Sequence, residues 1–159
     1  MAVKYGLKLD DVCKLASNEN PLGPSPKALA AAERALEEVR FYPEGGGLAL
    51  RGKIAGHRGL RPEQIVLGNG SNEIIELLGH VFLRPGDEVV VGEFSFVVYK
   101  LVALLFGAKV MEVPMPQLRH DLNAMTAAIT DKTRLVFLAS PNNPTGTANN
   151  AEEIQSFAE

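Results

Sequence analysis

In the second half of the chain, short apolar runs alternate with longer segments in which apolar residues recur at helical spacing. The short runs predict strands, and the longer segments predict helices. Strands that alternate with helices form βαβ units, with a mainly parallel sheet that helices cover on both faces. We therefore expect an α/β fold with three layers. The predicted strands are residues 64–68, 88–92, 109–113 and 134–139, and the predicted helices are residues 71–83, 94–106, 121–129 and a helix that starts at Ala151.

The first part of the chain follows a different pattern. Residues 17–26 are dense in proline, glycine and asparagine, which predicts a stiff, extended arm. Ser25-Pro26 has the N-cap and the first-turn proline of a helix, and an apolar stripe continues to about residue 39. The loop 41–47 contains three successive glycines, so either a ligand or partner chain approaches it or it is a linker. A second helix is expected over residues 48–59.

Composition narrows the class of protein. The chain has 159 residues, 46% of them hydrophobic, which is enough for one sizeable core and excludes a disordered polypeptide. The net charge of −3 gives no electrostatic case for binding nucleic acid. No apolar span is long enough for a membrane, residues 1–6 lack a signal-peptide core, and Cys13 has no cysteine to pair with, so we expect a cytoplasmic protein. The three histidines are scattered, so no metal site is expected.

Residues 66–73 carry the first candidate site. Gly68 and Gly70 allow a tight turn, and the helix that follows begins near Ser71, which we expect to be its N-cap. Free N–H groups and the positive end of the helix dipole at such a start favour the binding of a phosphate. An ordinary capped helix explains the segment equally well. The dinucleotide-binding fingerprint does not apply, because Glu73 stands where its third glycine would be.

The loop 140–146 is a more specific candidate. Two prolines restrict its backbone and hold Asn142 and Asn143 between them, so an amide there can bind a ligand oxygen at a small ordering cost. We expect a cis peptide bond between Asn143 and the proline that follows it. At the carboxyl edge of a parallel sheet, this loop would meet the 66–73 and 93–96 turns around one crevice.

Four motifs occur in an order that resembles the class I/II, fold-type-I aminotransferases, which are enzymes that use pyridoxal 5′-phosphate. The resemblance covers the chain from Lys14 onward and is greatest to the histidinol-phosphate aminotransferases. It implies that residues 47–159 are part of the large cofactor-binding domain of that fold. It also implies that residues 1–46 are an N-terminal arm with a small-domain and dimer-contact segment. The four motifs are Ser17 to Ser25, Tyr42 to Gly46, Leu67 to Glu73 and Ser140 to Gly146.

The resemblance also implies roles for single residues in binding pyridoxal phosphate. Gly70, Ser71 and Asn72 match the positions that hold the cofactor phosphate at a helix N-terminus. Phe96 matches the aromatic residue that stacks on the pyridine ring, where the family more often has tyrosine. Asn143 matches the amide that donates a hydrogen bond to the phenolic oxygen of the cofactor.

Other positions imply a second copy of the chain. Tyr42 matches a tyrosine that reaches the cofactor phosphate in the neighbouring subunit, which implies a homodimer with sites at the interface. Asn18 and Asn20 match an arm that lies over the mouth of the substrate site. The substrates implied are a small-molecule amino donor and a keto acid.

The residues that carry out transamination are not among the matched positions. In this family the Schiff-base lysine, the acidic residue on the pyridine nitrogen and the arginine for the substrate carboxylate all come later than the position of Glu159. The predicted last helix also stops without a C-cap. We therefore expect the N-terminal part of an enzyme, with no catalytic residue of its own and no transaminase activity in isolation.

The function that the resemblance implies for the parent enzyme is histidinol-phosphate transamination. This reaction moves an amino group between L-histidinol phosphate and 2-oxoglutarate in histidine biosynthesis. The alternatives on the same scaffold are an aromatic amino acid aminotransferase and a threonine-phosphate decarboxylase. A nucleotide-binding α/β module would explain the glycine turn but not the 140–146 loop, and a non-catalytic fragment is a further alternative.

Overall fold

The computed structural model of the chain describes residues 2–13 and 17–159. It divides into two compact units, Met1–Gly47 and Leu48–Glu159, and each is described by itself. Lys14, from which the resemblance is expected to extend, lies outside the described residues.

The first unit has no core, since none of its described side chains is buried. Its main element is the helix α1 (Pro26–Ala35), which starts after Ser25 with proline in its first turn, as predicted. The stripe of apolar side chains on and after α1 is exposed, so its burial contributes nothing to stability within this unit. The remaining elements are the 3-10 helices Ala2–Tyr5, Leu9–Asp11 and Leu36–Glu38.

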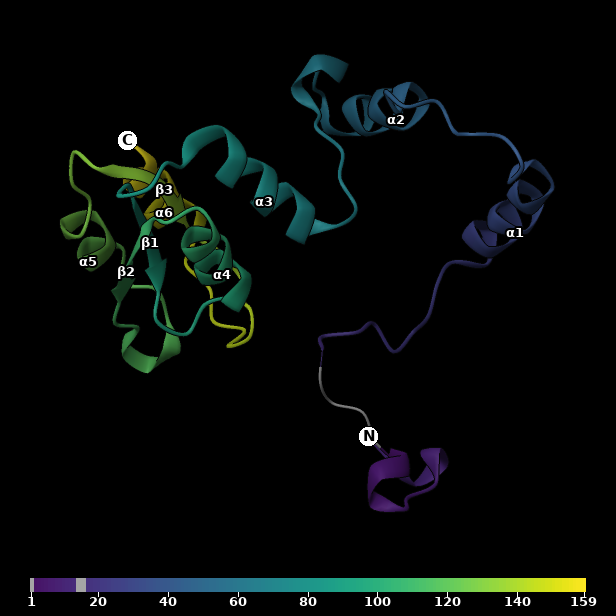
Figure 1. Ribbon diagram of the computed structural model, residues 1–159, viewed down its shortest axis with the longest axis horizontal. Coiled ribbons are helices and arrows are strands. Elements are labelled where there is room, and N and C mark those ends of the chain that lie inside the picture. The colour runs from purple at the N-terminus through teal and green to yellow at the C-terminus, as the bar shows by residue number, and fades with distance from the viewer. Residues whose placement is uncertain (1, 14–16) are drawn as a thin grey trace. The chain divides into compact units, whose positions relative to one another are not determined.

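The second unit is built on a sheet of three parallel strands in the order β2-β1-β3 (Figure 1). The strands are β1 (Glu88–Gly92), β2 (Lys109–Val113) and β3 (Thr133–Phe137). Every residue of β1 is buried, as expected for an apolar central strand that is covered on both faces. The register pairs Val90 of β1 with Met111 on one side and Val136 on the other.

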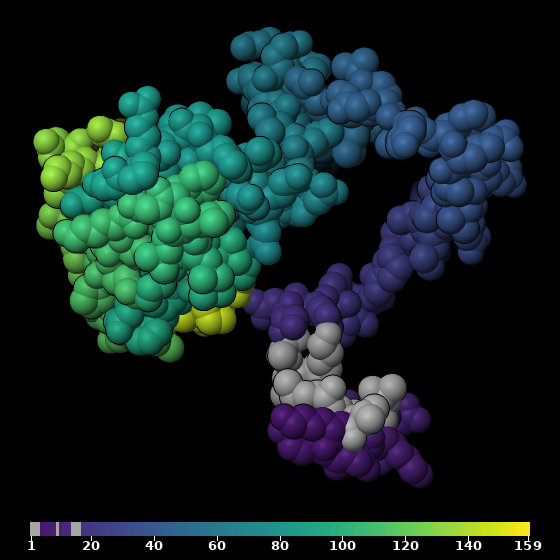
Figure 2. Space-filling model, viewed as in Figure 1, coloured from purple at the N-terminus to yellow at the C-terminus, as the bar shows by residue number. Residues whose placement is uncertain are grey.

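Helices cover both faces of this sheet, and their packed atoms form a compact body (Figure 2). The helix α4 (Val97–Leu105) lies over the face to which Val89 and Val91 point. The opposite face, to which Val90 points, is covered by α5 (Leu122–Ala127) and by Phe157 of α6 (Ala151–Ala158). The three-layer arrangement follows directly from the alternation of side chains along the strands.

Three further helices precede the sheet in this unit. The helix α3 (Ser71–Phe82) packs against α4 through Gly79, which lies close to Phe106 and Val102. The helix α2 (Leu48–Arg58) is followed by the 3-10 helix Pro62–Gln64, and the two are joined by hydrogen bonds from Arg51 to the carbonyl oxygen of Pro62.

The connections bring three loops to one edge of the sheet. The chain passes from β1 to β2 through α4, and then from β2 back across β1 to β3 through α5 on the opposite face. Right-handed crossovers in opposite directions require helices on opposite faces. Because the strands are parallel, the segments 92–96, 114–121 and 138–149 all leave the sheet at its carboxyl edge.

The predicted α/β class with a mainly parallel, three-layered sheet is confirmed, whereas two predicted elements differ. Residues 64–68 form no strand: Ile65 is extended (φ −109°, ψ 122°), but no described strand lies beside it to form a ladder. The helix expected at 94–106 begins only at Val97, because hydrogen bonds from Ser95 to the carbonyl oxygen of Gly92 close a turn first.

Replacing Gly79 with alanine tests the packing of α3 on α4. A Cβ atom at Gly79 would lie 2.6 Å from Cδ2 of Phe106 and 2.9 Å from Cγ1 of Val102. Overpacking of this kind costs roughly 1–3 kcal/mol, whereas alanine gains at most ~1 kcal/mol of helix propensity over glycine. We therefore expect Gly79→Ala to lower the free energy of unfolding in urea.

The matched control is Gly56→Ala on α2, where no atom lies within 4 Å of an added Cβ. This variant gains helix propensity without overpacking, so its free energy of unfolding should rise by about 0.5–1 kcal/mol. An equal rise in both variants would contradict the close packing of α3 against α4.

Candidate functional site

The N-terminus of α3 is exposed and carries no side-chain cap. Its N-cap is Gly70 (φ 82°), so Ser71 is the first helical residue and not the N-cap that the sequence predicted. The positive φ angle at this position is one that glycine adopts without strain. Glu73 turns back to accept hydrogen bonds from the backbone N–H and the side-chain amide of Asn69. The start of α3 at Ser71 and Asn72 is thereby left open to an anion.

The turn after β1 presents two phenylalanines with different surroundings. Phe96 is half-buried, and its ring meets the edge of Tyr99, with the two ring centroids 5.7 Å apart. Tyr99 in turn stacks on Phe137 of β3, at 4.5 Å between centroids. Phe94 lies two residues earlier and is 45% exposed. Sequence reasoning selected only Phe96, although the alternation of aromatic residues in this turn was the signal for both.

The loop after β3 is folded around the side chain of Asn142. Both of its proline bonds are cis, as predicted for Asn143–Pro144 and in addition at Ser140–Pro141. Asn142 is 3% exposed, and its Nδ2 donates to the carbonyl oxygen of Phe94 (3.0 Å) and to Oγ1 of Thr145 (2.8 Å). The Asn142 amide therefore connects this loop to the turn after β1, while its neighbour Asn143 remains half-buried.

Two of the sequence-predicted regions meet at one hollow of about 300 Å³. Phe94 and Phe96 line it from the turn after β1, and Pro144 lines it from the loop that carries Asn143. An ion pair between Lys100 and Glu112, at 2.7 Å, also borders the hollow.

The other predicted site residues lie elsewhere. Gly70, Ser71 and Asn72 do not line this hollow and stand at the start of α3. Tyr42, Asn18 and Asn20 belong to the first unit, where Tyr42 is fully exposed and Asn20 accepts a hydrogen bond from the N–H of Leu22 at 2.9 Å.

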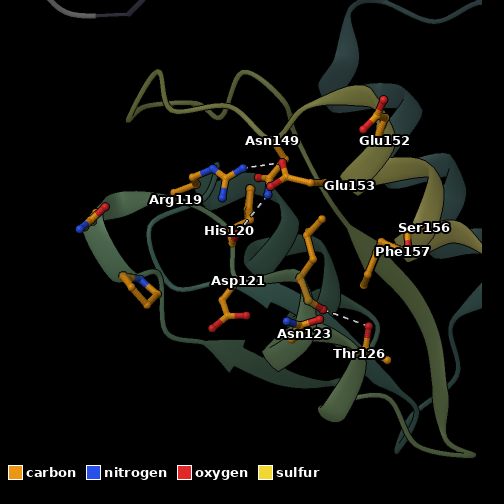
Figure 3. Close-up of a pocket in the computed structure, with 13 residues that line it drawn as sticks. Arg119, His120, Asp121, Asn123, Thr126, Asn149, Glu152, Glu153, Ser156 and Phe157 are labelled. Carbon is orange, nitrogen blue, oxygen red and sulfur yellow. Dashed lines mark hydrogen bonds and ion pairs between the residues drawn. The ribbon is translucent and has the colours of Figure 1, made fainter.

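A larger cavity of about 730 Å³ lies between the segment after β2 and α6 (Figure 3). Two of its charged side chains, Arg119 and Glu153, form an ion pair. Arg119 donates to a carboxylate oxygen of Glu153 and to the carbonyl oxygen of Ala148. The hydrogen bond from Arg119, followed by that from the N–H of Asn150, lowers the pKa of the Glu153 carboxyl. The carboxylate of Asp121 caps α5 by accepting from the N–H of Ala124. Because Arg119 is the only lysine or arginine among the described lining residues and is already engaged, the cavity offers no free cation for a cofactor phosphate.

His120 is the one titratable group of this region that is almost fully buried, at 3% exposed, among the described residues. Both ring nitrogens are out of contact with water and make no hydrogen bond of good geometry to the described residues. Burial lowers the pKa of His120, and the Asn142 side chain and the carbonyl of Ala139 beside the ring oppose this shift only in part. Nothing in the local sequence distinguishes this histidine from the other two.

Neither a membrane span nor a metal cluster was found in residues 2–13 and 17–159. No helix there combines the length and the apolar character needed to cross a bilayer. No three histidine, cysteine, aspartate or glutamate side chains there gather in a way that could hold a metal ion.

The buried neutral imidazole predicts a pH dependence of stability. Because the pKa of His120 is lower in the folded protein, the unfolded chain takes up this proton at a higher pH. The stabilisation is complete above the ordinary histidine pKa of about 6.5 and is lost as the pH falls below it toward the folded pKa. We expect the free energy of unfolding of His120→Gln to fall less at acidic pH than that of the wild type, as measured by urea unfolding at a series of pH values. His57→Gln on the exposed surface of α2 is the control, and an unchanged pH slope in His120→Gln would contradict the assignment.

Comparison with known proteins finds relatives that match nearly the whole chain. Residues 10–159 match the family described as aminotransferase class I and II. The chain is 51% identical over 157 residues to a histidinol-phosphate aminotransferase of Methylobacillus flagellatus, covering 99% of this chain and 42% of that protein. It is 46% identical to histidinol-phosphate aminotransferase 1 of Thiobacillus denitrificans, covering 100% and 41%. The chain therefore spans about two fifths of the length of these relatives.

Solved structures agree with the sequence relatives. The histidinol-phosphate aminotransferase of Sinorhizobium meliloti in complex with pyridoxal 5′-phosphate has a TM-score of 0.92 at 26% identity, over 99% of this chain and 42% of that one. A mutant aspartate aminotransferase of Thermus thermophilus has a TM-score of 0.79 at 27% identity, over 91% and 41%. With a family match over nearly its whole length and these relatives in sequence and structure, the chain belongs to the aminotransferase class I and II family.

Proposed function

We propose that the whole protein is a pyridoxal-phosphate-dependent aminotransferase that moves an amino group between L-histidinol phosphate and 2-oxoglutarate. The observation that carries this proposal is the 46–51% identity, along essentially the entire chain, to relatives named histidinol-phosphate aminotransferase. Histidine biosynthesis in the cytoplasm is the corresponding setting. The choice of substrate rests on these relatives, because the hollow described above contains no residue that distinguishes one amino donor from another.

The start of α3 fits the phosphate of this cofactor. The helix is twelve residues long, its N-terminus is exposed, and its N-cap is a glycine that contributes no competing side chain. An added Cβ at Gly70 would meet nothing within 4 Å, so there is room for an anion against the backbone. We assign the binding of phosphate to Gly70, Ser71 and Asn72, through N–H groups, a hydroxyl and an amide.

The hollow at the carboxyl edge fits the pyridine ring. Pyridoxal phosphate supplies an electron sink for the amino-group transfer when it is bound. We assign to Asn143 a hydrogen bond to the phenolic oxygen of the cofactor, because it stands on the loop that borders the hollow. The aromatic face comes from Phe96 or from Phe94, which both line the hollow. Phe96 is the residue that matches the family position, whereas Phe94 is the more exposed of the two.

A second subunit completes the site in this proposal. The ring of Tyr42 is fully exposed in the first unit, and we assign it to the cofactor phosphate of the neighbouring copy. Asn18 and Asn20 would lie over the substrate. The protein is then a homodimer, and the first unit, which buries none of its described side chains, gains its packing in the assembly.

The absorbance of the bound cofactor tests the proposed function. Purified whole protein mixed with pyridoxal phosphate should develop a band in the visible range. The band should shift on addition of L-glutamate or L-histidinol phosphate, since either donor transfers its amino group to the cofactor. Turnover of histidinol phosphate with 2-oxoglutarate should exceed that of phenylalanine by at least tenfold. A preference for phenylalanine, or release of carbon dioxide from threonine phosphate, would select one of the alternatives. A protein without any such band would contradict the whole proposal.

Removal of the amide of Asn143 should weaken cofactor binding. A hydrogen bond to a charged oxygen contributes about 1.5–3 kcal/mol, so Asn143→Ala should raise the dissociation constant of pyridoxal phosphate by roughly tenfold or more. Asn123→Ala is the matched control, because this exposed asparagine lines the larger cavity instead. The constant is measured by absorbance titration, and equal constants for the two variants would remove Asn143 from the site.

Substituting each phenylalanine separately identifies the stacking ring. Loss of a ring from the cofactor face should raise the dissociation constant about threefold to tenfold, in line with an aromatic contact of ~0.5–1.5 kcal/mol. We expect this effect from only one of Phe94→Leu and Phe96→Leu. No change in either variant would mean that neither ring contacts the cofactor.

A further inference from the structure

The segment after β2 places His120 between the other two loops of the carboxyl edge. An added Cβ at Gly92, the last residue of β1, would lie 2.7 Å from Nδ1 of His120 and 2.6 Å from Sδ of Met115. The imidazole therefore presses directly on the backbone where β1 ends and the Phe94 turn begins. Only glycine permits this approach, and the ring is consequently shielded from water.

On its other side the imidazole meets the loop after β3. The side chain of Asn142 and the carbonyl of Ala139 lie beside the ring. Both hydrogens of the Asn142 amide are engaged, one by Phe94 and one by Thr145. Its Oδ1 is buried and has no partner among the described residues, and the same holds for the two nitrogens of His120. A buried acceptor, Oδ1 of Asn142, and a buried potential donor on the imidazole thus lie next to each other, with the carbonyl of Ala139 as a second acceptor beside the ring.

The backbone around His120 is also tied to this loop. The side chain of Asn149 donates to the carbonyl oxygen of His120 (3.2 Å), and Thr147 donates to that of Leu118 (2.6 Å). Figure 3 shows Asn149 directed at the His120 backbone. Asn149 is anchored by paired hydrogen bonds with Ser140, the first residue of the loop motif. The position of His120 is therefore fixed by main-chain contacts, independently of its ring.

We propose that His120 is a positioning residue that acts through Asn142. It holds the loop after β3, which carries Asn143, and the turn after β1, which carries Phe94, in the geometry that receives the cofactor ring. The proposal rests on the proposed function. In this proposal the imidazole N–H of His120 is the donor for Oδ1 of Asn142, whose Nδ2 already donates to the carbonyl oxygen of Phe94. One neutral imidazole thereby sets the spacing between the two loops that line the hollow, without touching the cofactor itself.

The type of side chain matters because packing and hydrogen bonding make separate demands here. A phenylalanine has a ring that fills much of the same space but leaves Oδ1 of Asn142 without a donor in a buried place. A glutamine restores a hydrogen-bond donor but has no ring to fill the space of the imidazole. A merely space-filling role for His120 predicts that phenylalanine is the better substitute. The positioning role predicts that glutamine is.

The test compares His120→Phe and His120→Gln in the whole protein, with His57→Phe on exposed α2 as the control. Without cofactor, amide hydrogen exchange is measured at Asn142 and Gly146, whose N–H groups donate to Thr147 and Asn142 within the loop. We expect exchange at both amides to be at least tenfold faster in His120→Phe and near wild type in His120→Gln and His57→Phe. The dissociation constant of pyridoxal phosphate should follow the same order, with a rise of about tenfold in His120→Phe.

A double-mutant cycle with Asn142→Ala shows whether His120 acts through Asn142. In the Asn142→Ala background, His120→Phe should change the dissociation constant less than twofold, because the group through which it acts is gone. Additive effects would overturn the proposal, and so would slow loop exchange in His120→Phe. The exchange experiment needs no cofactor. A wild-type protein that binds no pyridoxal phosphate would therefore refute the proposed function, while the exchange rates still decide whether His120 holds the loop.

Discussion

The burial of β1 between two layers of helices is the constraint on which the candidate site depends. Val89, Val90 and Val91 are almost completely buried, and they point alternately to α4 and to α5. This apolar run fixes β1 as the central strand. With β1 central, right-handed crossovers place α4 and α5 on opposite faces and bring the ends of all three strands to one edge. The positions of Phe94, His120 and Asn142 all follow from that edge.

The proposed cofactor site has two parts with different physical character. The start of α3 is polar, exposed and uncapped, as suits a strongly charged group that keeps part of its hydration. The hollow at the carboxyl edge is lined by two phenylalanines and by Pro144 of the stiff loop, as suits a flat ring. Between them the cofactor would be held by its charge at one end and by its shape at the other.

The sequence predicted the parts of the structure that depend on local pattern. The three strands of the sheet, the helix over residues 71–83 and the cap at Asp121 required only periodicity and turn residues. Prediction from the sequence failed where the conformation or burial of a residue depends on a partner that is distant in the chain. Residues 64–68 have the composition of a strand but lack a neighbour in the described sheet. His120 is an ordinary polar residue in the sequence, and its burial depends on Gly92, which lies 28 positions earlier.

The hydrogen bonds of the loop after β3 can run in only one direction. The carbonyl of Leu118 has no hydrogen to give, so Thr147 must donate to it and can only accept from Thr145. The hydroxyl of Thr145 donates its hydrogen to Thr147 and therefore accepts from the side-chain nitrogen of Asn142. The relay thus has a fixed polarity that starts at an amide and ends at a carbonyl. An inverted Asn142, with its oxygen and nitrogen exchanged, would set lone pair against lone pair at both Phe94 and Thr145.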